Sequence, residues 1–298
     1  MSVTNFRTSG AGSGAAISKI TFQSLQDKKR AHRPISALTA YDYATARLVD
    51  EAGVDMVLVG DSLAMVVMGY ETTLPVTVDE MLHHTRAVRR AVKRAMVVAD
   101  MPFGSYQVNV AEGVANAIRF LKEAGAEAVK IEGGAVRCEL VERLAGAEIP
   151  VVCHLGLTPQ SVHRMGGYKV QGKTQAAADE LVRDARMLEA AGASAMVLEG
   201  MPREVAARIT SELRIPTIGI GAGPDCDGQI LVFHDLVNLS FSQPPKFVRQ
   251  YGDAAALFRS AIDGYVRDVE ERAFPSEAES YHLPDSPSRH TRPAPSLG

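Results

Sequence analysis

The stretch EAGAEAVKIEG, residues 123–133, decides the expected fold. It reads as the end of a helix, a glycine that closes the helix, a short turn and then an apolar strand. Similar stretches stand at residues 51–61, EAGVDMVLVGD, and at residues 190–200, AAGASAMVLEG. A unit that recurs along a chain in this way indicates a fold assembled from copies of one supersecondary element.

The spacing of the three copies gives the number of units. Their first residues lie 72 and 67 positions apart, from 51 to 123 and from 123 to 190. Weaker strand-like runs, AMVVAD at 95–100 and IPVVCHLG at 149–156, fall between them. Each interval therefore holds two strand–helix units of about 35 residues, and eight such units need about 280 residues. The chain has 298 residues.

The order of the expected elements indicates a parallel sheet. Patterns typical of helices lie between most of the strands, for example at 78–92 and 174–191, and strands that alternate with helices form parallel sheets. No glycine-rich dinucleotide fingerprint follows the first strand, so a single-domain (β/α)8 TIM barrel is favoured over an open doubly wound sheet. The expected strands are 35–40, 55–60, 96–100, 128–132, 150–154, 195–199, 216–220 and 230–235.

Composition argues against several classes of function. The net charge is -3 and no Lys/Arg-rich stripe occurs, so no nucleic-acid partner is expected. No apolar run reaches about 18 residues, so no membrane span is expected. The three cysteines are scattered without metal-ligand spacing, which fits a reducing cytoplasm. Residues 1–18 read as a flexible tail, 19–272 as the barrel and 273–298 as a disordered tail.

Charged side chains collect where the expected strands end. In a barrel, the carboxyl ends of the strands form the mouth of the active site. Lys130 and Glu132 lie two residues apart on one strand, so their side chains point to the same face. Further charged or titratable residues end neighbouring strands at the same rim: Asp61, Asp100, His154 and Glu199.

The acids of this rim predict a metal site. Asp61, Asp100 and Glu132 come from adjacent strands and would repel one another in a mouth of low dielectric constant. A divalent cation resolves this repulsion, and oxygen ligands without a Cys/His cluster suit Mg²⁺ better than zinc. For Asp61 taken alone, capping of the next helix is an equally good explanation.

Two further residues have expected roles beside the metal. Lys130 would hold a substrate carboxylate or stabilise an enolate oxygen; a structural Lys–Glu pair and a Schiff-base lysine are the alternatives. Glu199 ends a strand of apolar residues, which suits a general base, with a capping or supporting carboxylate as the alternative.

Two glycine-containing segments lie near the same rim. Residues 219–228, GIGAGPDCDG, resemble the phosphate-binding loops of many barrels, but close backbone packing or a folate contact explains them equally well. Residues 166–173, GGYKVQGK, have glycines near both ends and look like a mobile loop over the mouth.

Eight motifs occur in order along the chain: TAYDYATA (39–46), LVGDSLAMVVMG (58–69), TLPVTVDEM (73–81), KIEGG (130–134), HLGLTPQS (154–161), GGYKVQG (166–172), IPTIGIGAG (215–223) and DGQILV (227–232). Together they closely resemble the ketopantoate hydroxymethyltransferase family. The resemblance covers about residues 19–272, and motifs of this length in this order are highly specific.

The resemblance implies an activity, a cofactor and an assembly. That family has a (β/α)8 barrel of the phosphoenolpyruvate/pyruvate type and forms homodecamers. It transfers a one-carbon unit from 5,10-methylenetetrahydrofolate to C3 of 3-methyl-2-oxobutanoate, which gives ketopantoate in the first committed step of pantothenate and coenzyme A synthesis. An enolate stabilised beside Mg²⁺ is the reactive form of the oxo acid that we expect.

Carried over residue by residue, the resemblance also implies individual roles. Asp61 and Asp100 would hold Mg²⁺, with Glu132 a third ligand, either directly or through a water. Glu199 would accept the C3 proton. The residues that would contact or surround the oxo acid are Asp61, Ser62, Asp100, Lys130 and His154.

Two alternatives stay open on the sequence. A Mg²⁺-dependent lyase or mutase of the isocitrate lyase or phosphonopyruvate type would share the barrel plan. Those families usually carry a catalytic cysteine in a KKCGH-like loop, and this sequence has none. The other alternative is a non-catalytic barrel that binds an oxo acid, and the complete set of acids, Glu199 included, argues against it.

Overall fold

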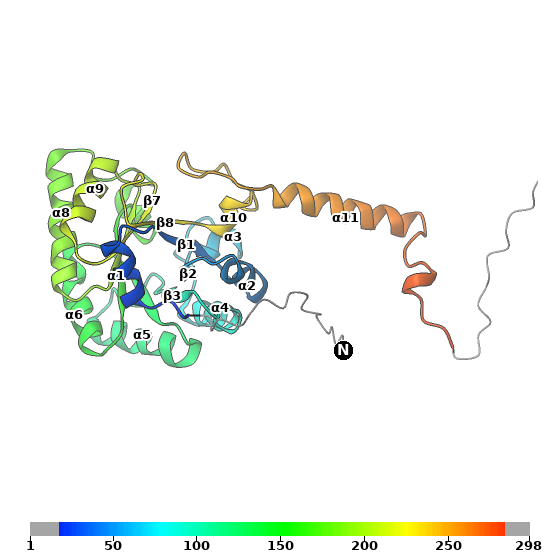
Figure 1. The fold of residues 1–298 in the computed structure, drawn as a ribbon, viewed down its shortest axis with the longest axis horizontal. Helices are drawn as coiled ribbons and strands as arrows, with labels where there is room; N and C mark the ends of the chain where they lie inside the picture. The colour runs from blue at the N-terminus through cyan, green and yellow to red at the C-terminus, as the bar shows by residue number, and fades with distance from the viewer. Residues whose placement is uncertain (1–17, 284–298) are drawn as a thin grey trace, which may run out of the picture. The chain divides into compact units, whose positions relative to one another are not determined.

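The computed structural model describes residues 18–283 and contains a closed barrel of eight parallel strands (Figure 1). Each strand pairs with the next one along the chain, and the last pairs with the first, which confirms the (β/α)8 prediction. The strands are β1 (Ile35–Thr39), β2 (Met56–Val59), β3 (Met96–Asp100), β4 (Ala128–Glu132), β5 (Val151–Gly156), β6 (Ala195–Glu199), β7 (Thr217–Ile220) and β8 (Gly228–Leu231).

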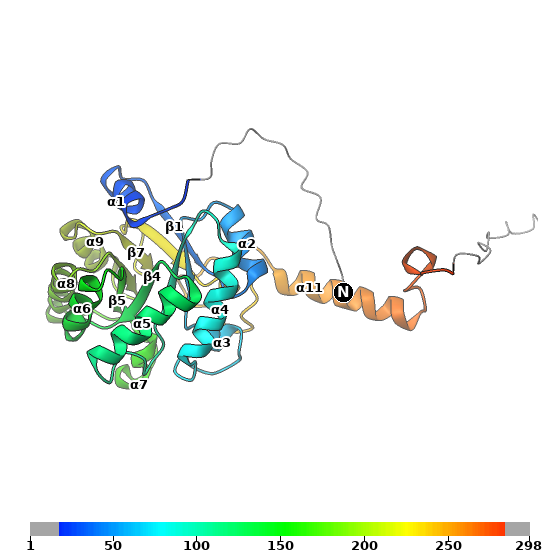
Figure 2. The ribbon, with the colours of Figure 1, turned by 90° about the horizontal axis from the view of Figure 1, so that it is seen from below.

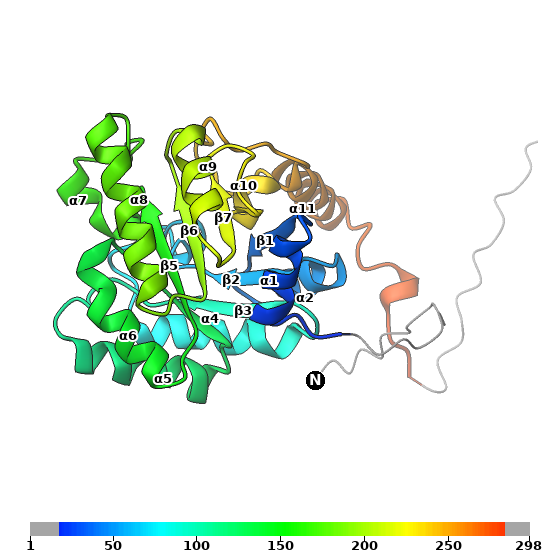
Figure 3. The ribbon, with the colours of Figure 1, turned by 60° about the vertical axis from the view of Figure 1, so that its left-hand side comes forward.

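Helices surround the strands, as Figure 3 shows for α4, α5, α6 and α8. The helices of this outer layer are α2 (Tyr43–Glu51), α4 (Val78–Ala91), α5 (Val110–Ala124), α6 (Cys138–Gly146), α8 (Gln175–Ala190) and α9 (Arg203–Glu212). The shorter helical segments are α3 (Leu63–Val66), η1 (Ala135–Arg137), η2 (Pro159–Ser161), α7 (Val162–Met165) and α10 (Phe233–Leu236).

The sequence repeat has a direct structural counterpart. Gly53, Gly125 and Gly192 follow α2, α5 and α8 with backbone φ of +85°, +71° and +106°. Residues with a Cβ rarely adopt this left-handed conformation, so glycine ends each helix and turns the chain into the next strand. Each copy of the repeat is therefore a helix end joined to a barrel strand.

Alternate residues of each strand face the inside of the barrel. On β4 the inward positions are Ala128, Lys130 and Glu132, so one apolar residue deep in the barrel is followed by two charged residues near the mouth. The apolar interior below the mouth consists of Ile35, Ala37, Met56, Leu58, Met96, Val98, Ala128, Val152, Ala195, Val197, Ile218 and Ile230.

The helix α1 (Phe22–Arg30) lies at the amino-terminal end of the barrel, and α3 and α7 lie at the opposite end (Figure 2). Leu25 of α1 packs with the apolar interior. Lys28 pairs with Asp55, directly before β2, at 2.6 Å. These contacts close the end of the barrel that carries no strand-end acids.

The eighth strand begins earlier than the sequence predicts. The prediction placed it at 230–235, whereas β8 is Gly228–Leu231 and Phe233–Leu236 forms the short helix α10. Gly228 pairs with Ile35 of β1, and a Cβ at Gly228 would overlap the Ile35 carbonyl oxygen. The closing strand can approach β1 here because glycine has no side chain, a requirement that apolar patterning does not reveal.

The chain divides after Tyr251 into two compact units. The second unit contains α11 (Ala254–Glu270) and a short helical turn, η3 (Glu277–Glu279). The exposed apolar side chains of α11 are Leu257, Phe258, Ile262, Tyr265, Val266 and Val269.

The two expected tails extend beyond the part of the chain that the structure describes. Residues 1–17 of the expected tail 1–18 and residues 284–298 of the expected tail 273–298 lie outside it. Within residues 18–283, no helix has the length and the apolar character that a membrane crossing requires.

Candidate active site

The strand-end residues predicted from the sequence all line one cavity of about 440 Å³ at the carboxyl ends of the strands. Its floor is polar, while much of its wall comes from apolar side chains such as Leu157, Val197 and Ile220. A cavity with convergent charged groups on an apolar wall is the arrangement expected of an active site. The predicted residues in it are Asp61, Ser62, Asp100, Lys130, Glu132, His154 and Glu199.

Five of these side chains form a row of alternating charge across β3, β4, β5 and β6. Asp100 Oδ1 lies 2.8 Å from Lys130 Nζ, which lies 3.8 Å from Glu132 Oε1. Glu132 Oε1 lies 3.3 Å from His154 Nδ1, and His154 Nε2 lies 3.2 Å from Glu199 Oε2. Within the described residues the two imidazole contacts fall short of hydrogen-bond geometry, so they are close electrostatic contacts.

Strand register places these groups side by side. Asp100 pairs with Lys130, and Glu132 with His154, in the backbone ladder. Glu199 pairs with Gly156, two residues beyond His154 on β5. Because side chains two residues apart point the same way on a strand, His154 faces the same interior as Glu199. The row is therefore set by the backbone of the barrel.

The row holds its two basic groups in the charged form. Burial lowers the pKa of Lys130, but Asp100, Glu132 and Asp61 outweigh it, so the net shift is upward. Burial and Lys130 lower the pKa of His154, yet the carboxylates of Glu132 and Glu199 raise it to about 9. His154 is therefore an imidazolium at neutral pH, flanked by two carboxylates.

Asp61 and Ser62 lie directly after β2, beside this row. Asp61 N donates to Asp100 Oδ2 at 3.0 Å. Burial, together with the charges on Asp100 and Glu132, holds the pKa of Asp61 well above its usual range. The Ser62 hydroxyl lies 2.8 Å from the Tyr41 hydroxyl. Three acids thus crowd one buried corner, as the sequence predicted.

Gln160 connects these acids, and sequence reasoning missed it. Its Nε2 donates to Asp61 Oδ2 at 2.9 Å and to the Met101 carbonyl at 3.0 Å. Its backbone N–H donates to Glu132 Oε2 at 3.0 Å. The side-chain oxygen accepts from the Tyr106 hydroxyl at 2.6 Å. In the sequence, Gln160 follows His154 closely and lies within the motif HLGLTPQS (154–161), but neither signal indicates what the side chain contacts.

Tyr106 is the second missed residue, and no sequence signal points to it. Its hydroxyl donates to Gln160 and accepts from Glu132 N at 3.0 Å. The guanidinium carbon of Arg137 lies 5.1 Å from the centre of its ring. Tyr106 thus joins β4 to the loop that carries Gln160.

The donor set fits a hard cation held by few protein ligands. Within residues 18–283 no group of three or more His, Cys, Asp and Glu side chains is preformed as a metal site. Asp61 and Asp100 adjoin each other and supply only oxygen donors, which suits Mg²⁺ bound by one or two carboxylates with waters and substrate oxygens. Glu132 already contacts Lys130, His154 and Gln160 N, which favours contact with a metal through water.

The glycine run 219–228 is explained in part by close packing. Gly221 has φ +62°, and a Cβ there would lie 2.6 Å from Cδ1 of Phe247. Gly223 has φ +78° and packs against Arg203. Both positions require glycine for backbone conformation and space. Loop 166–173 contributes Tyr168, Lys169 and Val170 to the wall of the cavity.

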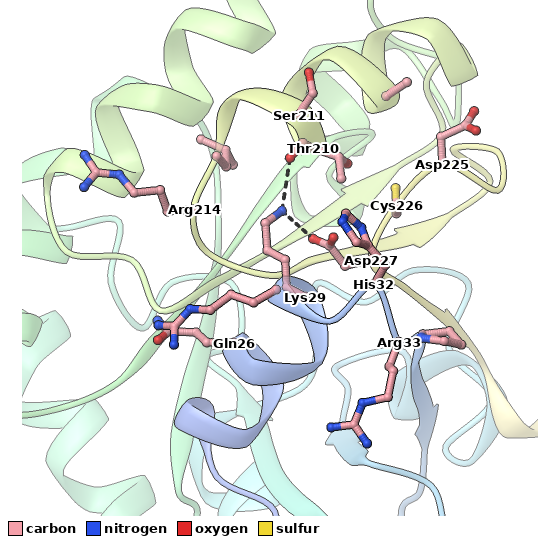
Figure 4. Close-up of a pocket in the computed structure, with 14 residues that line it drawn as sticks. Gln26, Lys29, His32, Arg33, Thr210, Ser211, Arg214, Asp225, Cys226 and Asp227 are labelled. Atoms are coloured by element: carbon pink, nitrogen blue, oxygen red, sulfur yellow. Dashed lines mark hydrogen bonds and ion pairs between the residues drawn. The ribbon is translucent and has the colours of Figure 1, made fainter.

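A larger cavity of about 920 Å³ lies between α1 and α9, away from the strand-end acids (Figure 4). Lys29 crosses it, donating to the Thr210 carbonyl at 3.0 Å and pairing with Asp227 at 2.7 Å. Arg33 and Arg214 lie on opposite sides of the view in Figure 4. Its central cation is neutralised within the fold, so we place the chemistry in the smaller cavity.

Comparison with known sequences identifies a family. The model of the ketopantoate hydroxymethyltransferase family matches residues 19–277. A 3-methyl-2-oxobutanoate hydroxymethyltransferase of Koribacter versatilis is 66% identical over 267 residues, 90% of each chain. One of Geotalea daltonii is 53% identical over 262 residues, 88% of this chain and 98% of the relative.

Solved structures share the fold at much lower identity. A 2,3-dimethylmalate lyase of the PEP mutase/isocitrate lyase superfamily aligns with a TM-score of 0.56 and 18% identity, over 83% of this chain and 85% of its own. A phosphonopyruvate hydrolase in complex with oxalate and Mg²⁺ aligns with a TM-score of 0.54 and 20% identity, over 87% of this chain and 92% of its own. At this level of sequence identity the similarity shows that the barrel fold is shared, and it says nothing about activity.

Proposed function

The chain belongs to the ketopantoate hydroxymethyltransferase family and is a transferase, and we propose that it converts 3-methyl-2-oxobutanoate to ketopantoate with 5,10-methylenetetrahydrofolate as one-carbon donor. The observation that carries this proposal is the single cavity that gathers all the predicted strand-end residues. The lyase or mutase alternative has support only from the shared barrel fold, and the names of the relatives favour catalysis over mere binding.

The metal in this proposal is Mg²⁺, which Asp61 and Asp100 would hold, with Glu132 beside them as a further ligand. Bound there, Mg²⁺ would act as a Lewis acid that polarises the 2-oxo carbonyl and makes the C3 proton more acidic. Gln160 orients Asp61 through the 2.9 Å hydrogen bond. Asp61 and Ser62, at the start of the turn after β2, contact the oxo acid.

Lys130 and Glu199 carry the charge and the proton of the substrate. The ammonium of Lys130, whose pKa is raised by the surrounding acids against the effect of burial, binds the negative oxygens of the oxo acid and stabilises the enolate. Glu199 accepts the C3 proton at a carboxylate oxygen. The carbanionic C3 then forms a bond to the methylene carbon of the folate while the bond from that carbon to N10 breaks and N10 takes up a proton. Water then replaces N5 at the same carbon, which releases ketopantoate and tetrahydrofolate.

His154 keeps Glu199 in place for this step. The imidazolium contacts Glu199 Oε2 at 3.2 Å from one side and Glu132 Oε1 at 3.3 Å from the other. These contacts fix the position of the Glu199 carboxylate at the edge of the cavity. The other oxygen of Glu199, Oε1, is the atom that we assign to proton transfer.

One assay tests the reaction and one variant tests the base. The full chain is incubated with Mg²⁺, 3-methyl-2-oxobutanoate and methylenetetrahydrofolate, and ketopantoate is measured; folded protein without product would refute the proposal. Glu199→Gln should slow exchange of the C3 proton with deuterated water by about 10²- to 10⁴-fold, the usual contribution of a general base. Unchanged exchange in that variant would remove Glu199 from the role.

The assembly and the compartment are also proposals. The exposed apolar side chains Phe258, Ile262, Tyr265, Val266 and Val269 recur at helical spacing along α11, and such a stripe is normally buried against another surface. Together with the family resemblance this supports a homo-oligomer, a decamer, which the mass in solution measures. Three free cysteines support a reducing, cytoplasmic compartment.

A further inference from the structure

The rim of the active-site cavity carries four side chains that the chemistry above does not use. Tyr168 and Lys169 come from loop 166–173, and Lys246 and Phe247 come from the segment after α10. On each segment an aromatic ring is followed or preceded directly by a lysine. We propose that this rim binds the co-substrate, with its flat heterocycle against the two rings and its carboxylates paired with the two lysines. The inference rests on the proposed function.

The two aromatic side chains are held in place and still present surface. Tyr168 is 49% exposed, and its hydroxyl lies 3.8 Å from the sulfur of Met65. Phe247 is 38% exposed, and its ring packs on the backbone of Gly221. Packing on one side fixes each ring without covering it completely. Fixed aromatic surface at the entrance of a cavity favours a planar, conjugated ligand, which gains from stacking as well as from burial.

The two lysines are unused by the fold. Both are exposed, and neither ammonium group makes a hydrogen bond or an ion pair with any residue from 18 to 283. By contrast, Lys130 in the floor of the same cavity is paired with Asp100 at 2.8 Å. The rim lysines are therefore the cations that remain available to a carboxylate from solution.

The charge of the floor explains why such cations are needed. The floor holds the carboxylates of Asp61, Asp100, Glu132 and Glu199. An anionic ligand that approaches them is repelled unless positive charge lies on its path. Lysines at the rim supply that charge without entering the row of paired groups below. They also hold the carboxylates of the ligand away from the floor, which leaves its reactive end free to face C3 of the oxo acid.

The cavity has the size of an ordinary ligand pocket. Its volume is about 440 Å³, within the range of about 300–1,000 Å³ found for pockets that bury drug-sized molecules. A small oxo acid in the floor leaves room toward the rim. The rim then selects a co-substrate that combines an aromatic heterocycle with one or more carboxylates.

The test compares two forms of the co-substrate, 5,10-methylenetetrahydrofolate and the corresponding pteroate in which the benzoate is a primary amide, so that no carboxylate remains. The variants are Lys169→Met, Lys246→Met and the double variant. Each single change should raise KM for the folate by about two- to fivefold, the range of exposed ion pairs, and the double change by about tenfold. KM for the pteroate, KM for the oxo acid and C3 proton exchange should stay unchanged.

Two further variants separate the rim from general effects. Lys173→Met is the matched control, since Lys173 is exposed on the same loop but does not line the cavity; all its constants should match the wild type. Phe247→Leu keeps apolar cover over Gly221 but removes the flat ring. It should raise KM for both co-substrate forms by about two- to tenfold.

The outcomes that overturn the inference are distinct from those that overturn the function. If the wild type forms ketopantoate and the double lysine variant keeps its KM for the folate, the rim does not bind the carboxylates. Equal losses for folate and pteroate would also overturn it. If the wild type forms no ketopantoate, the proposed function fails, and the binding of tetrahydrofolate is then measured by calorimetry to test the rim separately. Equal affinity of the wild type and the double variant overturns the proposed binding at the rim. Weaker binding by the double variant supports it.

Discussion

Replacing Gln160 by leucine tests the buried network beneath the active site. The side chain of Gln160 makes hydrogen bonds to Asp61 Oδ2, the Met101 carbonyl, the Tyr106 hydroxyl and Gln107 Nε2. Leucine has a similar volume but supplies none of them. Asp61 Oδ2, the Met101 carbonyl and the Tyr106 hydroxyl are buried and would lose this partner, whereas Gln107 is partly exposed and can turn to water.

The magnitude follows from those three groups. A buried polar group left without its partner costs about 1–3 kcal/mol, so three cost roughly 3–9 kcal/mol. For a domain of this size each kcal/mol lowers Tm by about 2–4 °C, which predicts a fall of at least about 6 °C by calorimetry. Gln175→Leu is the matched control, because Gln175 is an exposed glutamine whose side chain bonds, among residues 18–283, only Asp179 on the same helix. The Tm of this variant should differ from that of the wild type by less than about 2 °C.

A second measurement distinguishes positioning from simple stability. If Gln160 orients Asp61 for the metal, Gln160→Leu should weaken activation by Mg²⁺ by about 10- to 100-fold, the usual effect of losing a partner of a metal ligand. The assay is initial rate against Mg²⁺ concentration, well below Tm. A lower Tm with an unchanged Mg²⁺ midpoint would refute the positioning role. An unchanged Tm would refute the network argument itself.

Further predictions concern the backbone and the pH dependence of the same site. Gly156→Ala should lower the free energy of unfolding by about 3 kcal/mol or more, because Gly156 has φ +94° and a Cβ there would overlap the Glu199 carbonyl oxygen. The control is Gly146→Ala, where a Cβ has open space. Thermal unfolding of both variants measures the difference, and equal losses of stability would contradict the prediction. Burial lowers the pKa of His154, but the carboxylates of Glu132 and Glu199 outweigh this effect and raise the pKa to about 9. The stabilisation by His154 is therefore complete below about pH 6.5 and is lost as pH rises through about 9, roughly 3 kcal/mol in all. Between pH 6 and 10, Tm should fall more steeply for the wild type than for His154→Gln, and parallel curves would disprove the linkage.

The sequence predicted those features that follow from local periodicity. The recurring helix end, glycine and strand gave the number of units, and period two placed Lys130 and Glu132 on one face. Parallel strands bring their carboxyl ends to one edge, so the predicted residues had to converge once the barrel was recognised.

The features that the sequence did not predict depend on contacts between distant residues. Gln160 and Asp61 are 99 positions apart, and no local pattern indicates that the loop after β5 returns to the turn after β2. The start of β8 depends on the close approach of Gly228 to Ile35. Whether His154 contacts one or both neighbouring carboxylates depends on side-chain directions that strand assignment alone leaves open.

The row of alternating charge has a consequence for anyone who would redesign this enzyme. Each member from Asp100 to Glu199 lies beside a group of opposite charge, so replacing one by a neutral residue removes a counter-charge from each of its buried neighbours. A new base or a new anchor therefore has to be introduced by paired substitutions that keep the signs alternating, for instance by moving Glu199 and His154 together. Substitutions in this site therefore have to be designed for pairs of oppositely charged residues and not for single residues.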